Sequence, residues 1–169
     1  MNSKILVATI LSAILITSAF CYADNKPSNS SSKQNTISGP FKKILVGEYI
    51  KVVLVQDASA SSVTIIGDEK KISYINVSMS NNELSIKSKK NFLNRKITVY
   101  VPVKDLSLVE LKNGSSIFGE GALQFNDLTV TAGNDCRVAL KAHGNITLKT
   151  TEDCVFVFEK NEGAKVVYE

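Results

Sequence analysis

The segments VELKNGSSI (109–117), VTAGNDCRV (130–138) and LKTTEDCVF (148–156) share one template and decide the fold. Each has a β-prone run, a short polar turn and a second β-prone run, and successive copies begin roughly 20 residues apart. A period near 20 suits one coil of a parallel β-solenoid, whose stacked strands face a continuous core. The repeat therefore predicts a right-handed parallel β-solenoid, a β-helix-like stack of short strands, with KVVY (165–168) beginning one more coil.

The chain from residue 40 to the first repeat is also rich in strand-forming residues. Val, Ile and Thr favour a pleated surface because branching at Cβ restricts them in helices. Strands are predicted over residues 49–56, 62–66, 74–79, 83–87 and 96–101, joined by turns that include Gln56-Asp57, Gly67-Asp68 and Asn81-Asn82. No window of a dozen residues shows apolar residues at helical spacing. The fold class is therefore predicted to be all-β.

Residues 1–23 have the pattern of a secretory signal peptide. Lys4 precedes an uncharged apolar block over residues 5–20, and the segment ends in Cys-Tyr-Ala, which predicts cleavage after Ala23. The apolar block is shorter than the roughly 20 residues that span a bilayer, and no second block of that length follows. An uncleaved anchor and lipidation of Cys21 are the alternatives, although Phe20 stands where a lipobox needs a small residue. Export to the periplasm, the cell surface or the medium follows.

Residues 24–39 predict a flexible linker, because Ser, Asn, Lys, Pro and Gly dominate and Ile37 is the single aliphatic residue. The remaining residues, 40–169, then form one domain. The whole chain carries 20 Lys and Arg against 16 Asp and Glu, a formal net charge of +4. That surplus is too small and dispersed for a nucleic-acid-binding surface, so no nucleic acid is expected as a partner.

Two cysteines remain after signal cleavage, Cys136 and Cys154, and they occupy the same position in adjacent repeats. Stacked strands lie about 4.8 Å apart, within the Cα separation that a disulfide tolerates. An oxidising compartment favours such a bond. A disulfide between Cys136 and Cys154 is one interpretation, and two free thiols packed as small hydrophobic groups are the other.

The segments FKKILVGEYIKVVLVQ (41–56), LSI (84–86), ITVYVP (97–102) and NGSSI (113–117) resemble the putative auto-transporter adhesin, head GIN domain family. The resemblance covers almost everything after the linker. It implies a signal peptide followed by a single β-solenoid-like domain of a bacterial envelope or secreted protein, and it supplies no catalytic residue. The turns differ from the Gly-Ser-Gly usual in the family, because they read NGS (113–115), GND (133–135) and TED (151–153).

Candidate catalytic groups are few. His143 is the only histidine and lies in a predicted turn, where no nucleophile is placed beside it. Asp135 and Asp153 are expected to stack one coil apart, and a carbohydrate-active enzyme would need two such carboxyls at a set separation. A calcium site on the same ladder is a further reading, although the spacing matches no calcium-loop repeat. Aspartate also favours turns for local hydrogen bonding, which explains both residues without catalysis. No cofactor or metal is expected.

A basic stretch, SKKNFLNRK (88–96), and the residue before it supply the candidate ligand residues Lys87, Lys89, Lys90, Arg95 and Lys96. In an exported protein these side chains suit anionic lipid or acidic polysaccharide. A solvated hairpin loop is the competing interpretation, since Lys also discourages pairing between strand edges.

The sequence therefore predicts an exported, non-catalytic β-solenoid domain with an adhesin-like or scaffolding role at the bacterial cell envelope. Its partners would be a cell-surface glycan or another envelope component, with homo-oligomers through exposed solenoid edges. The two alternatives are a carbohydrate-active enzyme that uses Asp135 and Asp153, and an envelope protein that binds lipid or an acidic polymer.

Overall fold

The computed structural model describes residues 30–57, 59–90, 97–150, 153–160 and 165–168. Within them lie one twelve-stranded sheet and a single four-residue helix. The elements are β1 (Ser31–Thr36), β2 (Lys43–Val46), β3 (Lys51–Gln56), β4 (Ser62–Gly67), α1 (Glu69–Ile72), β5 (Ile75–Ser80), β6 (Glu83–Ser88), β7 (Thr98–Val103), β8 (Leu108–Leu111), β9 (Ser116–Ala132), β10 (Arg137–Thr150), β11 (Val155–Lys160) and β12 (Lys165–Tyr168). The predicted all-β class is confirmed.

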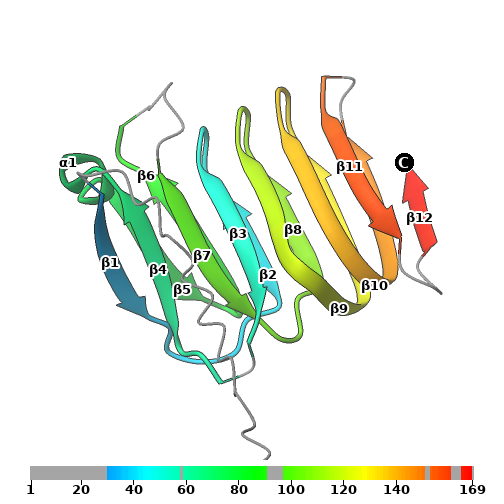
Figure 1. Cartoon of the computed structure of the whole chain (residues 1–169), viewed down its shortest axis with the longest axis horizontal. Helices are drawn as coiled ribbons and strands as arrows, with labels where there is room; N and C mark the ends of the chain where they lie inside the picture. Colours follow the sequence, from blue (N-terminus) through cyan, green and yellow to red (C-terminus); the bar gives the residue numbers. More distant parts are fainter. Residues whose placement is uncertain (1–29, 58, 91–96, 151–152, 161–164, 169) are drawn as a thin grey trace, which may run out of the picture.

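The sheet folds back on itself into two layers. The first layer runs β1-β4-β7-β3 and continues through the first parts of β9 and β10 to β11. The second layer runs β5-β6-β2-β8 and continues through the last parts of β9 and β10 to β12. Figure 1 shows β9 and β10 curving from one layer into the other at its lower edge. These two long strands therefore hold both layers in one hydrogen-bonded sheet.

The strand directions are mixed, which corrects the expectation of a uniformly parallel solenoid. Pairing is parallel from β7 through β11 and from β6 through β12, but β1–β4, β4–β7 and β5–β6 are antiparallel. The turn between β5 and β6 explains one of these pairs. Asn81 and Asn82 have φ angles of 50° and 60°, and two left-handed residues form the type I′ turn that reverses a chain into a hairpin.

The internal repeat is confirmed in the register of the second layer. Val109 pairs with Val130, and Val130 pairs with Leu148, so the first residues of the three repeats stack in adjacent strands. The segment 165–168 forms β12 and pairs in parallel with β10, as the sequence predicts.

The core lies between the layers and is built from alternate residues of each strand. Val52, Ile117 and Val138 stack in neighbouring strands of the first layer, and none is more than 2% exposed. Val109, Val130 and Leu148 form the matching row of the second layer. Each such side chain contributes roughly 1.5–3 kcal/mol relative to an exposed one.

Residues 31–36 differ from the flexible linker expected over residues 24–39. They form β1, which pairs antiparallel with β4 along six residues, from Ser31 opposite Gly67 to Thr36 opposite Ser62. The polar sequence suits an edge strand, because its stabilisation comes from backbone hydrogen bonds rather than from apolar burial. Ile37 then enters the core at 8% exposure, and its amide donates to the Ser61 carbonyl at 2.7 Å.

Candidate binding surface

The outward side of the first layer carries a row of aromatic and aliphatic side chains, one from each of five adjacent strands. In register across β7, β3, β9, β10 and β11, the row consists of Tyr100, Val53, Phe118, Ala139 and Val157. Their chain neighbours Val52, Leu54, Val99 and Val101 are fully buried, so alternation along each strand directs the row away from the core. We call this row the aromatic row, and the outward side of the first layer the aromatic face.

The aromatic row is exposed to different degrees along its length. Val157 is 51% exposed, and Val155 on the same strand is 53% exposed. Val53 is only 9% exposed although it faces outward, because Tyr100 and Phe118 occupy the strands on either side of it. The Lys51 ammonium lies 4.8 Å from the centre of the Phe118 ring, a cation–π contact. The aromatic row is therefore a partly exposed apolar strip with the Lys51 ammonium beside it.

The outward side of the second layer, which we call the polar face, has a different character. Lys43 lies between two carboxylates, 3.2 Å from Glu83 and 3.0 Å from Glu110. The hydrogen bonds to Glu110 and then Glu83 raise the pKa of the Lys43 ammonium. Threonines and a further lysine continue this face: Thr129, Thr131, Thr147 and Lys149. Half-buried Leu45 and Leu108 lie among them, and Val167, 37% exposed, lies beside Thr147.

The contrast between the two faces identifies the aromatic face as the candidate site. Both faces belong to one sheet and cover the same core, so fold stability does not account for the difference. Charged and hydroxyl side chains are ordinary for a solvated surface, whereas a row of outward-facing, partly exposed apolar side chains on adjacent strands marks a contact site for a partner. Nothing in the sequence singles out these residues, because Val53, Tyr100 and Phe118 lie far apart along the chain.

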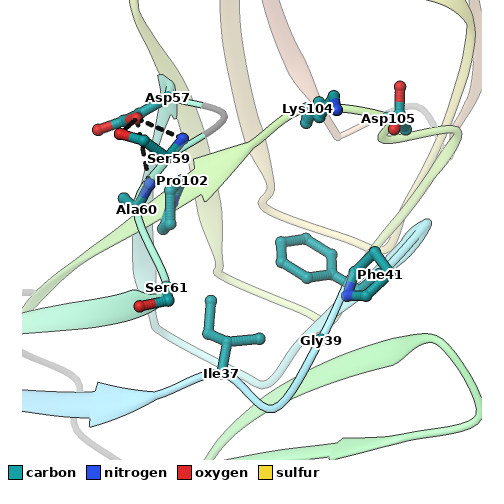
Figure 2. A pocket seen from close by; sticks show the side chains of 11 residues that line it. Ile37, Gly39, Phe41, Asp57, Ser59, Ala60, Ser61, Pro102, Lys104 and Asp105 are labelled. Atoms are coloured by element: carbon teal, nitrogen blue, oxygen red, sulfur yellow. Dashed lines mark hydrogen bonds between the residues drawn. The ribbon is translucent and has the colours of Figure 1, made fainter.

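A pocket of about 320 Å³ lies beside the aromatic face, where β1 leads into β2 and where β3 and β7 end. Figure 2 shows the Phe41 ring and the Ile37 side chain on its wall. The Asp57 carboxylate accepts hydrogen bonds from the Ser59 hydroxyl at 2.7 Å, the Ser59 amide at 2.8 Å and the Ala60 amide at 3.1 Å. The Ser59 bonds lower the pKa of Asp57, so this carboxylate serves to hold the turn.

A second, more polar hollow of about 760 Å³ shares Lys104 and Asp105 with this pocket. Gln56, Gln124, Asp127 and His143 also line it. His143 lies within β10 rather than in the expected turn, immediately before a register shift that ends at Asn145. Asp127 accepts a hydrogen bond of 2.8 Å from the Asn145 side chain. Polar groups therefore gather in this hollow.

The structure describes part of the predicted basic stretch. Lys87, Lys89 and Lys90 lie at and beyond the end of β6, in the second layer, whereas Arg95 and Lys96 lie outside the described residues. The Lys90 ammonium is 3.2 Å from the Tyr74 hydroxyl and 4.4 Å from the centre of its ring. These lysines are therefore not part of the aromatic face.

The two cysteines occupy equivalent positions directly before the adjacent strands β10 and β11, as predicted, and both are free thiols. Cys136 is 1% exposed, and its thiol donates to the Lys112 carbonyl at 3.2 Å. The Cys154 thiol donates to the Gly133 carbonyl at 2.8 Å. Burial raises the pKa of the Cys136 thiol, partly opposed by a hydrogen bond with Ser115. The disulfide is absent from the structure and stays a prediction for the oxidised protein.

Asp135 and Asp153 precede these cysteines at equivalent positions in two turns. Asp135 has a φ angle of 56°, a left-handed conformation that Asp adopts more readily than most residues. Asp153 is exposed in its turn. Among the described residues no group of three or more His, Cys, Asp or Glu side chains is placed to hold a metal ion.

Comparisons with known proteins agree with this architecture. The family model described as putative auto-transporter adhesin, head GIN domain, matches residues 40–161. A search of curated proteins returns no match. In the described part of the chain no helix has the length and hydrophobicity needed to cross a bilayer.

Three similar crystal structures come from Parabacteroides. A putative adhesin from P. distasonis is 18% identical with a TM-score of 0.67, and the match covers 79% of this chain and 58% of the adhesin chain. One from P. merdae is 22% identical with a TM-score of 0.55, covering 73% and 59%. A putative lipid binding protein from P. distasonis is 14% identical with a TM-score of 0.60, covering 80% and 61%. The chain thus spans about three fifths of each, and the likeness shows the fold.

Proposed function

Because this chain belongs to the putative auto-transporter adhesin, head GIN domain family, we propose that it is a non-catalytic, adhesin-like or scaffolding domain of the bacterial cell envelope. The observation that carries the proposal is the aromatic face, where Tyr100, Val53 and Phe118 lie side by side on three adjacent strands. Such a face binds a partner by contact area and needs neither a nucleophile nor a metal.

The regular stacking of strands supports a role in binding extended partners. Parallel pairing from β7 to β11 places equivalent side chains at a constant step of about 4.8 Å. This region is solenoid-like, and we infer that it follows the coil of about 20 residues seen in the repeat. A cell-surface glycan or another envelope component fits a surface of that kind. Homo-oligomers through the outer strands, where Val155 and Val157 are exposed, are a further proposal.

Binding to a panel of immobilised polysaccharides and envelope fractions tests the proposal. We expect Tyr100→Ser with Phe118→Ser to weaken capture of the exported protein about tenfold or more, while Thr129→Ala with Thr147→Ala on the polar face leaves capture unchanged. Equal loss in both double variants would contradict a site on the aromatic face. Cleavage of any polysaccharide in the panel would contradict a non-catalytic role.

A second candidate function is the binding of a lipid or an acidic polymer. The pocket beside Phe41 supports the lipid, because its wall is apolar at Ile37, Pro40 and Phe41, while its charged residues are Lys104, Asp57 and Asp105. A structurally similar protein is described as a putative lipid binding protein. We expect Phe41→Ala to reduce uptake of a fluorescent fatty acid, with Lys89→Glu and Lys90→Glu testing the basic stretch in liposome flotation. Unchanged uptake in Phe41→Ala would remove the pocket from consideration.

The carbohydrate-active alternative has no comparable support. It requires Asp135 and Asp153 to act as a pair, yet each lies in a turn for which aspartate is a favoured residue without catalysis.

A further inference from the structure

We propose that the aromatic face binds an extended acidic polysaccharide that carries one carboxylate or sulfate per disaccharide. The inference rests on the proposed binding function and specifies the chemistry of its partner. Two features of the face carry it: the spacing of its aromatic rings and the position of its cations relative to them.

The aromatic rings are spaced by two strands. Tyr100 lies on β7 and Phe118 on β9, with Val53 of β3 between them in the same register row. Two steps of about 4.8 Å place the Cα atoms of Tyr100 and Phe118 roughly 10 Å apart. This is about the length of one disaccharide in an extended β-linked glycan. A sugar chain that crosses the strands can therefore lay the C–H face of alternate rings against Tyr100 and Phe118, with Val53 as the floor between them.

The cations form a second row with the same spacing. Lys51 on β3 and Arg137 on β10 are both in register with Ser116 of β9, which lies between them and is only 3% exposed. The Cα atoms of Lys51 and Arg137 are thus also two strands, or roughly 10 Å, apart. This cation row lies two residues along the strands from the aromatic row, a step of roughly 7 Å. An acidic group on every second sugar would meet one cation per repeat.

The other charges of the face favour the same orientation. On the opposite side of the aromatic row, Lys141 is paired with Glu159 at 2.8 Å, and Glu120 adds a negative charge. That side is therefore negative in sum and disfavours acidic groups, whereas Lys51 and Arg137 attract them, with the exposed Asp135 and Asp153 confined to the turns before β10 and β11. Arg137 is exposed and suits a carboxylate or a sulfate, because its guanidinium offers paired donors. The Lys51 ammonium, now over the Phe118 ring, would move from the ring to the acidic group as the sugar stacks.

Titration calorimetry with hyaluronan oligosaccharides tests the proposal, because each hyaluronan disaccharide carries one carboxylate. Fully N-acetylated chito-oligosaccharides of equal length are the uncharged control. We expect the exported protein to bind hyaluronan at least about tenfold more tightly than the neutral oligosaccharide, with affinity falling as salt rises. Phe118→Leu, which keeps an apolar side chain but removes the flat ring, and Arg137→Gln should each weaken binding about fivefold or more. Lys149→Gln on the polar face is the matched control and should leave affinity unchanged.

Each other result is decisive. Equal affinity for neutral and acidic oligosaccharides, or equal loss in Lys149→Gln and Arg137→Gln, would overturn the acidic-glycan assignment. Preference for anionic vesicles or single-stranded DNA over hyaluronan would assign the face to another class of partner and also overturn it. Binding of a neutral glycan that is lost in Phe118→Leu would overturn the acidic-glycan inference but leave the proposed binding function in place. If the protein binds neither these oligosaccharides nor any member of the panel of polysaccharides and envelope fractions, the inference and the proposed function are both rejected.

Discussion

Gly144 is a residue whose replacement should be costly because of its backbone. It has a φ angle of 100° in β10, and a Cβ atom added there would overlap the Phe125 carbonyl oxygen. Because a backbone atom cannot move aside cheaply, we expect Gly144→Ala to lower the free energy of unfolding by about 3 kcal/mol or more. Urea denaturation measures the change.

Gly121 provides the matched control for that substitution. Its φ angle is 72°, but no atom lies within 4 Å of an added Cβ. Gly121→Ala should therefore cost only the left-handed backbone strain, about 1–2 kcal/mol. Similar losses in the two variants would show that the contact with Phe125 adds nothing.

The two thiols should differ in reactivity although they stack in equivalent positions. Cys136 is 1% exposed, and burial raises its pKa. A smaller fraction of this thiol is therefore thiolate than in an ordinary cysteine at the same pH. Cys154 is partly exposed. We expect N-ethylmaleimide to label Cys154 of the native reduced protein at least about tenfold faster, with Cys136 reacting mainly after unfolding. Mass spectrometry of peptides measures both rates. Equal rates would contradict the buried position of Cys136, and loss of both labelling reactions after mild oxidation would establish the disulfide.

At the scale of the strand, β9 combines a core residue and a surface residue at adjacent positions. Ile117 is fully buried between Val52 and Val138, whereas Phe118 faces outward. We expect Ile117→Ala to cost about 2–5 kcal/mol, because it leaves a cavity in the stacked core. Phe118→Ala should cost about 1 kcal/mol, the loss of cross-strand contacts. Thermal and urea unfolding of both variants measure these costs, and a larger loss for Phe118→Ala would reverse the assignment of core and surface.

The sequence predicts the positions of the strands far better than it predicts how they pair. Alternation of apolar residues located β3 to β7 within two residues of their observed ends, and the repeat gave the stacking of Val109, Val130 and Leu148. Alternation contains no information on strand direction, so the antiparallel pairs of β1 and β4 were not anticipated. Nor does alternation locate the bend of β9, which runs without a break from the first layer into the second.

At the scale of the whole molecule, the candidate site depends on contacts that no local pattern contains. Tyr100 and Val53 meet because β7 stacks on β3, and Phe118 joins them because β9 lies on the other side of β3. The sequence directed attention to the basic stretch after β6 and to the turn aspartates, since charged residues are conspicuous in a sequence. The aromatic face consists of residue types that usually fill cores, and only the fold shows that they point outward.

The final prediction concerns the fate of the whole chain. The apolar block at 5–20 and the small residue Ala23 suggest export with cleavage before Asp24. Cleavage removes Lys4 and no acidic residue, so 19 basic and 16 acidic side chains leave a net charge of +3 on the exported protein. We expect full-length protein made in a bacterium with an outer membrane to leave the cytoplasm, and intact mass analysis to show a chain that begins at Asp24.

Two variants separate cleavage from its alternatives. Leu11→Arg places a charge in the apolar block and should retain the full-length chain in the cytoplasm, because the export machinery selects for an uncharged segment. Cys21→Ser should leave the mature mass unchanged if Cys21 is discarded with the signal. Incorporation of labelled fatty acid that disappears in Cys21→Ser would instead show a lipid anchor on that residue. In that case the aromatic face would be held near a membrane surface by the segment between Cys21 and β1, rather than released with a free N-terminus at Asp24.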